Sequence, residues 1–580
     1  MSGVERAGGP KALVALLVGL LCVACTVNGG APVSPRPLPD DASRPAEDQP
    51  SAFIELGPTE PDEVVDFSIS LVMPGAAELA DFLAGLNDPR SPHFGRYLDA
   101  QGFGARFGLP VGDVDAVVAW LQGSGMEIVA RYPQRTSLVA RGRAADVNRL
   151  FGVTLVDRQN AEGIRYHVPL GEPVVPAEMA GRVASVVGLD SEPAVRPART
   201  TIYGAGVPGG GLRPPDVAKA YEIEELHAAG LRGEGQTVGI ISFDTFNASD
   251  IAAWDQEMDV TGPAVEFVRL EGAPTTPGSG VGEVSLDIQV IRGIAPAAQI
   301  INYEAQNRLS NFGPLIARVV ADGRVDIASI SWGLCERYYP PQVVAANEQE
   351  FAAAFAAGIS IFVASGDEGA YDCRRLSPSG DDFDRDLSIA VDLPAAGPSV
   401  IAVGGTFLTV RQDGHYYEEV AWEEPLGGHG TGGGVSVFHP RPTWQQAFGL
   451  DNAATMRQVP DVAGPADSTS GFLVIHTEPG EDEPSMGAVG GTSAAAPFWA
   501  GSMVLAKQLA NQQGIPALGA LGPQLYALAA EQPAGAVFHD IVRGGNLLHQ
   551  AGPGWDYATG LGSPRVSPLA RALVARLAGQ

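Results

Sequence analysis

Five short and almost uninterrupted apolar runs constrain the fold of this chain more than any other feature of its sequence. Stretches of helical periodicity separate the runs, which cover residues 237–243, 298–303, 326–332, 359–364 and 399–403. Parallel strands buried on both faces have this continuous apolar character, and helical crossovers connect them. The pattern predicts an α/β domain over residues 206–580, with a mostly parallel sheet and helices on both faces. In such folds functional residues gather beyond the carboxyl ends of the strands.

The region before this domain has a different pattern, which predicts a smaller α+β domain on an antiparallel sheet over residues 63–195. Residues 65–71 alternate between apolar and polar, as a half-buried strand does. Further predicted elements are helices over 76–86, 111–123 and 144–151 and a strand-turn-strand over 127–140. A chain of 580 residues is too long for one core, so two domains are expected. Residues 196–205, with Pro197 and Arg199, form the predicted linker and processing region.

The first 25 residues have the features of an export signal. Arg6 and Lys11 flank an apolar run that ends at residue 25 and is too short to span a bilayer as a mature helix. Its last four residues resemble a bacterial lipoprotein signal with Cys25 as the lipidated residue, although Cys22 stands where leucine is usual. An ordinary signal peptide is the alternative, and both predict a secreted or cell-envelope protein. Residues 26–62 are rich in Pro, Asp, Ser and Glu, which predicts a disordered linker, and no later segment has the composition of a membrane span.

Charge and cysteine content narrow the class of protein. The 67 acidic residues outnumber the 37 basic ones and give a net charge of -30, so binding to nucleic acid phosphates is disfavoured. The same balance suits an acidic environment, where protonation relieves repulsion between carboxylates. Beyond the signal only Cys335 and Cys373 remain. Outside the cytoplasm a single disulfide between them is predicted, and two separate buried thiols are the alternative.

Residues 490–497 carry the most specific chemical signal. Two glycines lead into Ser493, which opens a helix of small and apolar residues that runs toward Lys507. Small residues allow close approach of a backbone, and a helix N-terminus favours negative charge. Both features suit a serine nucleophile whose attack generates an oxyanion. A plain serine N-cap is the common alternative for a serine before a helix.

The base for such a serine is predicted in the apolar helix around residue 285. Glu283 and Asp287 lie four residues apart and therefore on one helix face. An exposed acidic face is the alternative, but the neighbouring residues are apolar, which predicts that at least one carboxyl is partly desolvated, and paired carboxyls can share a proton. A glutamate accepts protons in acid, where a histidine is already protonated. His429, in a glycine-rich stretch that no helix follows, is the other candidate base and is predicted to lie in a loop.

Asp367 follows the apolar run that ends at residue 364, where sites of parallel sheets assemble. A carboxylate beside a forming oxyanion is unfavourable, but a protonated aspartic acid donates a hydrogen bond. Such a site works only at low pH. A turn aspartate before glycine is the alternative for this stretch alone.

These three stretches, in this order, resemble the sedolisin family of serine-carboxyl peptidases. The resemblance implies a catalytic triad of Glu283, Asp287 and Ser493, with Asp367 as the oxyanion-hole aspartate. It extends to residues 87–94 with 120–121, typical of the activation domain of sedolisin precursors, and to residues 432–436 and 442–445. From about residue 63 to the C-terminus it implies an inhibitory prodomain followed by a subtilisin-like catalytic domain. Ala495 and Ala496 stand where some members have serine.

The C-terminal region resembles the single calcium site of the same family. By that resemblance Asp540 and Asp556 supply carboxylates, and Ile541, Gly552 and Gly554 supply backbone carbonyls. Oxygen ligands of both kinds suit Ca²⁺. Two aspartates in glycine-rich turns are the alternative interpretation.

The function that the resemblance implies is acid-acting endopeptidase activity on protein or peptide substrates. The chain is expected to be an autoactivating precursor, inhibited by its own prodomain, and a monomer. Three alternatives stay open: a tripeptidyl-peptidase of the same family, a subtilisin-type enzyme that uses His429, and a non-catalytic surface protein with this fold.

Overall fold

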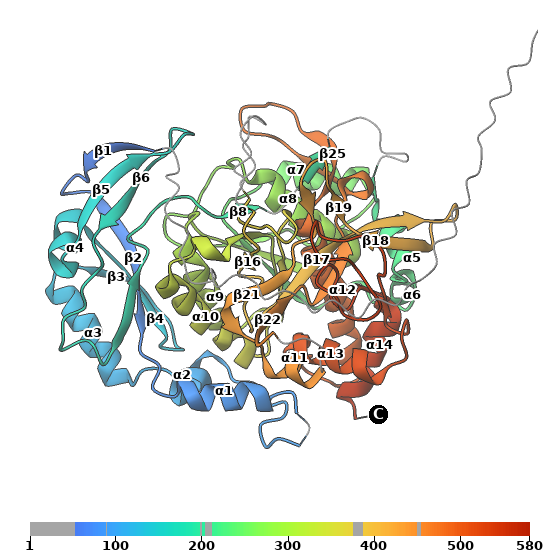
Figure 1. Ribbon diagram of the computed structural model, residues 1–580, viewed down its shortest axis with the longest axis horizontal. Helices are drawn as coiled ribbons and strands as arrows, with labels where there is room; N and C mark the ends of the chain where they lie inside the picture. Colours follow the sequence, from blue (N-terminus) through green and yellow to red (C-terminus); the bar gives the residue numbers. More distant parts are fainter. Residues whose placement is uncertain are drawn as a thin grey trace, which may run out of the picture. The chain divides into compact units, whose positions relative to one another are not determined.

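An eight-stranded sheet forms the centre of the C-terminal region in the computed structural model, which describes residues 53–88, 90–197, 200–202, 211–374, 387–448, 450 and 454–579 (Figure 1). Its strand order is β11-β12-β10-β13-β15-β17-β18, with β23 also paired to β17. All pairs are parallel except β17 with β18. The strands are β10 (Thr237–Ser242), β11 (Glu266–Arg269), β12 (Gln299–Glu304), β13 (Ile327–Ile330), β15 (Ser360–Ala364), β17 (Ile401–Val410), β18 (Tyr416–Ala421) and β23 (Val462–Pro465). The predicted mostly parallel sheet is confirmed.

Helices cover both faces of this sheet (Figure 1). The long helix α12 (Thr492–Gln512) contacts β10, β13, β15 and β17, and α8 (Val281–Ile294) packs against α12. Helices α9 (Phe312–Asp322) and α10 (Pro341–Ala356) pack against each other, and α9 contacts β12. The remaining helices are α5 (Pro214–Ala220), α6 (Glu224–Ala228), α7 (Ala248–Glu257), α11 (Thr443–Phe448), α13 (Leu521–Glu531) and α14 (Val566–Leu577). No helix in the described ranges is long and apolar enough to cross a membrane.

The N-terminal region is antiparallel, as the sequence predicts, but its strands form two sheets rather than the single predicted one. One has the order β3-β4-β2-β7, and the other has the order β1-β5-β6. The apolar side chains of β2 from Val65 to Leu71 are buried, and Phe67 makes an edge contact with Phe151 at 5.2 Å between ring centroids. The elements are β1 (Ile54–Pro58), β2 (Val64–Leu71), α1 (Ala76–Gly85), α2 (Ala100–Arg106), α3 (Val111–Gly123), β3 (Glu127–Arg131), β4 (Ser137–Arg143), α4 (Ala144–Phe151), β5 (Thr154–Gln159), β6 (Arg165–Leu170) and β7 (Val183–Val187).

The folded N-terminal region begins earlier than the sequence pattern indicates. Strand β1 lies inside the segment 26–62, which the composition predicts to be disordered, and it pairs with β5. Most of its side chains are exposed, so the strand has no alternating apolar pattern that would reveal it. The prediction was therefore wrong for residues 54–58. The predicted signal, with Cys25, and the rest of the predicted linker before residue 53 lie outside the described residues.

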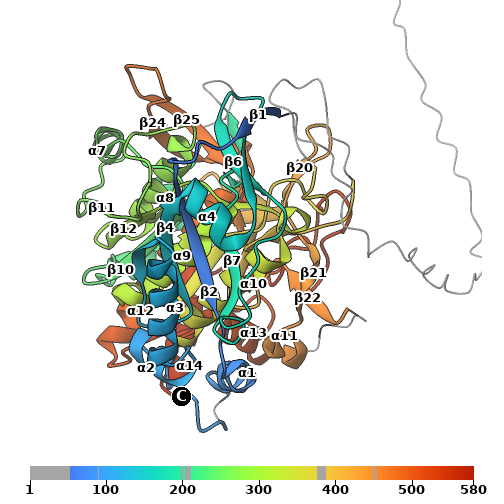
Figure 2. The ribbon, with the colours of Figure 1, turned by 90° about the vertical axis from the view of Figure 1, so that its left-hand side faces the viewer.

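The N-terminal region packs against the α9–α10 pair of the C-terminal region (Figures 1 and 2). Gln134 Nε2 donates a hydrogen bond to the carbonyl oxygen of Ala317 in α9 at 2.9 Å. Ser137 Oγ donates to Glu350 Oε1 in α10 at 2.7 Å, and Glu350 is buried there. Helices α1 and α2 also contact α10. The packing brings the prodomain sheet against the helices that cover the central sheet.

Candidate active site

Ser493 is the second residue of α12, at a sharp turn formed by two glycines. Gly491 has φ of 96°, a conformation that a residue with a Cβ rarely adopts. A Cβ on Gly490 would lie 2.1 Å from the carbonyl oxygen of Ala466, so that position also requires glycine. Ser493 is buried, and its Oγ donates a hydrogen bond to the carbonyl oxygen of Ser331 at 3.2 Å. The two glycines thus allow neighbouring backbone to approach closely just before the helix N-terminus at which Ser493 lies.

Glu283 and Asp287 lie on α8, the helix that packs against α12. Both side chains are fully buried, so the predicted desolvation of the pair is confirmed. Burial and the neighbouring charge of Glu283 raise the pKa of Asp287 well above its usual value. Asp287 is therefore held protonated in acid, and a protonated carboxyl can donate a hydrogen bond.

Ser331 connects the acidic pair to the nucleophile, and the sequence analysis did not identify it. Its Oγ lies 2.6 Å from Asp287 Oδ1 and 3.2 Å from the carbonyl oxygen of Ser493. Its own carbonyl oxygen accepts the hydrogen bond from Ser493 Oγ. The only sequence signal for it is its place directly after β13, at the edge where parallel strands end.

Asp367 lies beside the N-terminus of α12, three residues after the end of β15. Its Oδ1 accepts hydrogen bonds from the backbone N–H and the hydroxyl of Thr492, both at 2.8 Å. Its Oδ2 is buried and has no hydrogen-bond partner among the described residues. Burial raises the pKa of Asp367 to about 7. The side chain is thus neutral in acid and has one oxygen that can carry a proton next to Ser493.

The other candidate base, His429, was predicted to lie in a loop, but it lies in the two-residue strand β20 (His429–Gly430), which pairs with β19 (Glu423–Glu424). Burial lowers its pKa below the usual histidine value. A hydrogen bond to the backbone of Asp367 counteracts part of this shift. The neighbouring Gly430 N–H also donates to the carbonyl oxygen of Asp367 at 2.8 Å. His429 therefore supports the loop that carries Asp367.

Two short strands of the linker flank the nucleophile. Strand β8 (Arg196–Pro197) pairs antiparallel with β14 (Trp332–Cys335), the strand that follows Ser331. Strand β9 (Thr200–Ile202) pairs antiparallel with β25 (Ser485–Gly490), which leads into Ser493. The first strand thus ends opposite Trp332, and the second begins opposite Gly490. Residues 198, 199 and 203–205 of the predicted processing region lie outside the described residues.

The predicted disulfide is present and borders this site. Cys335, at the end of β14, is bonded to Cys373, and both residues are buried. Because Cys373 lies six residues after Asp367, the bond fixes the loop of Asp367 to the strand that pairs with the linker. Strand β16 (Asp392–Leu393) pairs with β14 on its other side.

Two of the segments predicted to bind calcium, the one at Asp540 and residues 552–556, contact each other. Both carboxylate oxygens of Asp540 accept from the N–H of Gly554 at 3.1 Å, and Asp556 Oδ2 accepts from the N–H of Gly552 at 2.9 Å. The carboxylates of Asp540 and Asp556 thus both accept hydrogen bonds from backbone N–H groups of residues 552–554. Burial raises the pKa of Asp556, and hydrogen bonds from the backbone N–H groups of Gly552, Thr559 and Ala558 counteract part of this shift. This donor set fits a hard cation.

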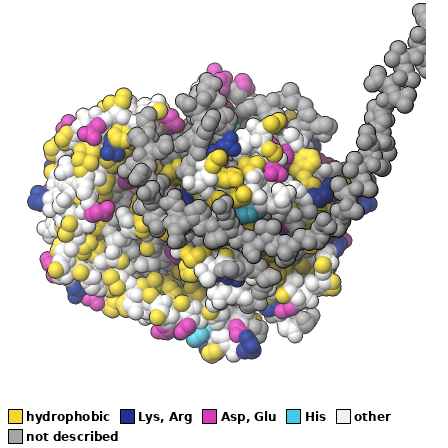
Figure 3. Space-filling view, viewed as in Figure 1, with side chains coloured by type: hydrophobic (Ala, Val, Ile, Leu, Met, Phe, Trp, Pro, Cys, Tyr) yellow, Lys and Arg dark blue, Asp and Glu magenta, His cyan; other side chains and the backbone are white. Residues whose placement is uncertain are grey.

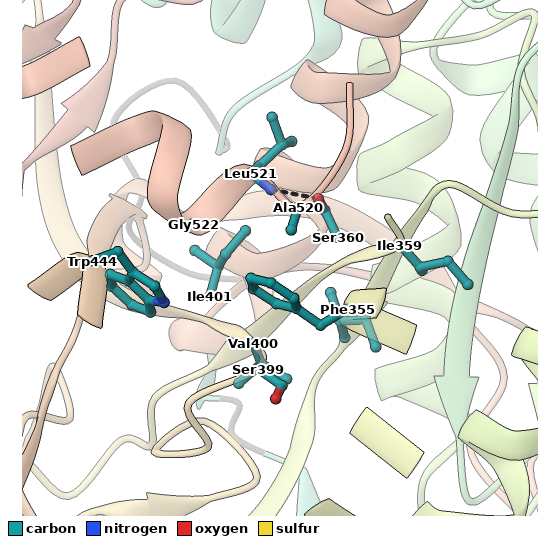
Figure 4. Close-up of a pocket in the computed structure, with 11 residues that line it drawn as sticks. Phe355, Ile359, Ser360, Ser399, Val400, Ile401, Trp444, Ala520, Leu521 and Gly522 are labelled. Carbon is teal, nitrogen blue, oxygen red and sulfur yellow. Dashed lines mark hydrogen bonds between the residues drawn. The ribbon is translucent and has the colours of Figure 1, made fainter. Parts of the chain in front are cut away.

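A small apolar cavity lies away from these residues, at the opposite end of the central sheet (Figure 4). Its lining includes Phe355, Ile401 and Trp444. The Ser360 hydroxyl on its edge accepts from the N–H of Leu521 and donates to the carbonyl oxygen of Gly519, both at 2.9 Å. Ser360 begins β15, whereas Asp367 follows the end of that strand. The cavity is therefore a packing feature between the sheet and α13.

Charged side chains on the molecular face drawn in Figure 3 are dispersed. Lys and Arg side chains stand among acidic and apolar ones, and the described residues of that face form no continuous basic area.

Comparisons with known proteins match both regions of the chain. Residues 51–192 match the pro-kumamolisin activation domain, and residues 248–524 match the subtilase family. Kumamolisin of Bacillus sp. (strain MN-32) is 33% identical over 565 residues, which cover 91% of this chain and 95% of that protein. Sedolisin of Pseudomonas sp. (strain 101) is 28% identical, with 93% of each chain covered. Tripeptidyl-peptidase 1 of Homo sapiens is 24% identical, with 97% of this chain and 99% of that protein covered.

A solved structure agrees with these matches. Pseudomonas sedolisin (serine-carboxyl proteinase) complexed with two molecules of pseudo-iodotyrostatin superposes with a TM-score of 0.54 at 26% identity, and it covers 64% of this chain and 99% of that chain. The subtilisin-like fold of the C-terminal region and the activation-domain identity of the N-terminal region are thereby confirmed. So is the prediction of a peptidase made as a zymogen. The chain belongs to the sedolisin family of serine-carboxyl peptidases.

Proposed function

We propose that this protein is a secreted, acid-acting endopeptidase that uses Ser493 as nucleophile, Glu283 as base, Asp287 as the partner of that base, and Asp367 as an oxyanion donor. The observation that supports it most is the position of Asp367. A buried carboxyl with a pKa of about 7 is held by Thr492, the residue before the nucleophile. A neutral acid at this place can stabilise negative charge, whereas its ionised form would repel it.

The proposed reaction is acyl transfer to Ser493 followed by hydrolysis. Ser493 Oγ turns from the Ser331 carbonyl and attacks the peptide carbonyl carbon, and Glu283 takes its proton. Asp287, protonated, donates a hydrogen bond to the Glu283 carboxylate and holds its orientation. The Asp367 hydroxyl and the Ser493 N–H bind the oxyanion. Glu283 then gives its proton to the leaving amine, and in the second half accepts one from the water that cleaves the acyl-enzyme.

Loss of the proton from Asp367 should set the upper end of the pH range in which the enzyme is active. Because the pKa of Asp367 is raised to about 7, the donor is present below that pH and is lost as the pH rises through it. Wild-type kcat/KM is therefore expected to fall about tenfold per pH unit above about pH 7. Asp367→Asn keeps a neutral donor at every pH, so its kcat/KM should stay flat across the same range. Asp367→Ala should lose about 10²- to 10³-fold in acid.

The measurement is kcat/KM on a quenched-fluorescence peptide between pH 4 and 8.5, with each variant processed by a trace of wild-type enzyme. The exposed Asp482, replaced by Asn, provides the matched control and should reproduce the wild-type profile. If kcat/KM of Asp367→Asn fell with rising pH in the same way as that of the wild type, the assignment of Asp367 as the oxyanion donor would be contradicted.

The calcium loop is proposed to hold one Ca²⁺ through the Asp540 and Asp556 carboxylates and the carbonyls of Ile541, Gly552 and Gly554. When bound, the ion would stabilise the folded C-terminal region. Chelation should lower the Tm of the full chain by several degrees, because a ligand that binds only the folded state stabilises it. Asp556→Asn should remove the difference between calcium and chelator. A calcium effect that persists in this variant and in Asp540→Asn would place the ion elsewhere.

The proposal that the protein is exported rests on the signal predicted in residues 1–25. It is tested by measuring the mass of the protein recovered from the cell envelope and from the medium. A lipid mass on Cys25 would establish an anchor, and an unmodified chain in the medium an ordinary signal peptide. A full-length chain found only in the cytoplasm would contradict export.

A further inference from the structure

Asn546 joins segments that meet beside the active site, and the proposed mechanism gives it no role. Its side chain is fully buried, and it lies in the chain between the two segments proposed to bind calcium. Its Nδ2 donates to the carbonyl oxygen of Gly433 at 3.2 Å and to that of Tyr557 at 3.0 Å. Its Oδ1 accepts from the N–H of His549 at 2.8 Å. Both amide donors and the amide oxygen are therefore used.

The loop of Asp367 packs closely against the backbone of Asn546. The Asn546 carbonyl oxygen accepts from the N–H of Ala370 at 3.0 Å, three residues after Asp367. Gly369 has φ of 64°, and a Cβ there would lie 2.4 Å from the same carbonyl oxygen. Only glycine allows this approach. The loop thus rests directly on Asn546, and a shift of Asn546 would move it.

Residues 430–433 form a second connection between the same parts of the molecule. On one side the N–H of Gly430 donates to the carbonyl oxygen of Asp367 at 2.8 Å. On the other side Thr431, which is fully buried, donates from its Oγ1 to the carbonyl oxygen of Ala558 at 2.8 Å. The Asp367 loop is therefore bonded to the calcium loop by two routes, one through Asn546 and one through Thr431.

The carboxylate of Asp556 lies at the other end of both routes. Its Oδ1 accepts from the N–H of Ala558 at 2.8 Å. Tyr557 and Ala558 follow this proposed calcium ligand directly in the chain. Their carbonyl oxygens are the ones that bond Asn546 and Thr431. A change in the position of the Asp556 carboxylate would therefore displace both of these bonds.

We propose that Asn546 is a positioning residue that holds the Asp367 loop in its active arrangement and couples this loop to the proposed calcium site. The inference rests on the proposed function and deepens it, because the cation would then affect the rate of the reaction as well as the stability of the fold. Coupling is a free energy shared between two sites. Calcium and a ligand of the oxyanion site must therefore strengthen each other's binding by the same factor.

The first test is the effect of Asn546→Ala on kcat and KM of the matured enzyme in calcium, on the quenched-fluorescence peptide at about pH 4. Each variant is processed by a trace of wild-type enzyme and assayed well below its Tm. kcat should fall about 10- to 100-fold, because a displaced oxyanion donor stabilises the transition state less, and KM should change by less than about threefold. Asn546→Asp keeps the acceptor for His549 and donates at most one of the two bonds, so it should retain more of kcat. It also replaces the alanine variant if that one does not fold.

Asn347→Ala is the matched control. Asn347 is also a buried asparagine whose amide bonds two backbone groups, the N–H of Gly313 and the carbonyl oxygen of Leu309, both at 3.0 Å, but it lies in α10. Its replacement should lower the Tm about as much as Asn546→Ala and leave kcat within about twofold of the wild type. An equal loss of kcat in both variants, or no loss in Asn546→Ala, would overturn the positioning role.

The second test measures calcium binding by calorimetry, on calcium-free matured enzyme with and without a peptide aldehyde. The aldehyde forms a hemiacetal with Ser493, so its oxygen takes the place of the oxyanion. In the wild type the Kd of calcium should be lower by about fivefold or more with the aldehyde bound, and in Asn546→Ala the aldehyde should leave it unchanged. No effect of the aldehyde in the wild type, or an equal effect in both enzymes, would overturn the coupling.

Failure of the proposed function gives different results. A wild-type enzyme that binds no calcium would refute the proposed calcium site and the coupling with it, and the kinetic comparison would then decide the positioning role alone. A wild type that cleaves no peptide and no denatured protein would refute the peptidase proposal itself, and the positioning role with it.

Discussion

The precursor with Ser493→Ala is expected to stay full length in acid, whereas the wild-type precursor should lose its N-terminal region. The alanine cannot form the acyl-enzyme, so peptidase activity should fall by about 10⁴-fold or more. Intact mass after incubation at about pH 4 measures the outcome. The wild-type product should begin within the predicted processing region, residues 196–205.

A serine in the same helix controls for damage to the fold. Ser502 is buried in α12, and its hydroxyl only donates to the carbonyl oxygen of Phe498 one turn earlier. Ser502→Ala should process at the wild-type rate. Trimming of purified Ser493→Ala precursor to the same product, with no added protease, would refute both the nucleophile and the self-processing.

Glu283→Gln is expected to lower kcat by about 10² to 10⁴, with a much smaller change in KM. Glutamine has nearly the same shape and can still accept the hydrogen bond from Asp287, but it cannot take the Ser493 proton. The side chain is fully buried, so no water is expected to replace it as base. Single-turnover rates on the quenched peptide at about pH 4 separate this chemical defect from weaker binding.

His429→Gln is the control that distinguishes the two candidate bases. In the proposed mechanism His429 only supports the Asp367 loop, so its replacement should leave most of kcat intact in acid. If Glu283→Gln were active and His429→Gln inactive, the enzyme would be a histidine-dependent serine peptidase of the subtilisin type.

Much of the architecture could be predicted because buried strands and helices have a recognisable apolar pattern in the sequence. Each predicted apolar run overlaps a strand of the central sheet, for example β10 within residues 237–243 and β15 within 359–364. The helices at residues 111–123 and 144–151 of the N-terminal region are α3 and α4, with the predicted bounds. In these elements the side chains that face the core set the period of the pattern.

Elements stabilised mainly by backbone pairing have no such apolar pattern in the sequence. Strand β1 exposes most of its side chains, and β8 has only two residues. Ser331 was not identified from the sequence either, because a single polar residue inside the apolar run 326–332 has no distinguishing pattern. Its position depends on the hydrogen bond to Asp287, a residue distant in the chain, which only the folded structure brings close.

The pH profile of the wild-type enzyme is the most direct test of the central claim that this serine peptidase works with carboxyl groups. The account predicts that kcat/KM of the matured enzyme is high in acid and falls as the pH rises through about 7, where Asp367 loses its proton. An activity that is absent near pH 4 and rises through pH 6 to 7 toward a neutral or alkaline optimum would contradict it, since that is the titration of a histidine base.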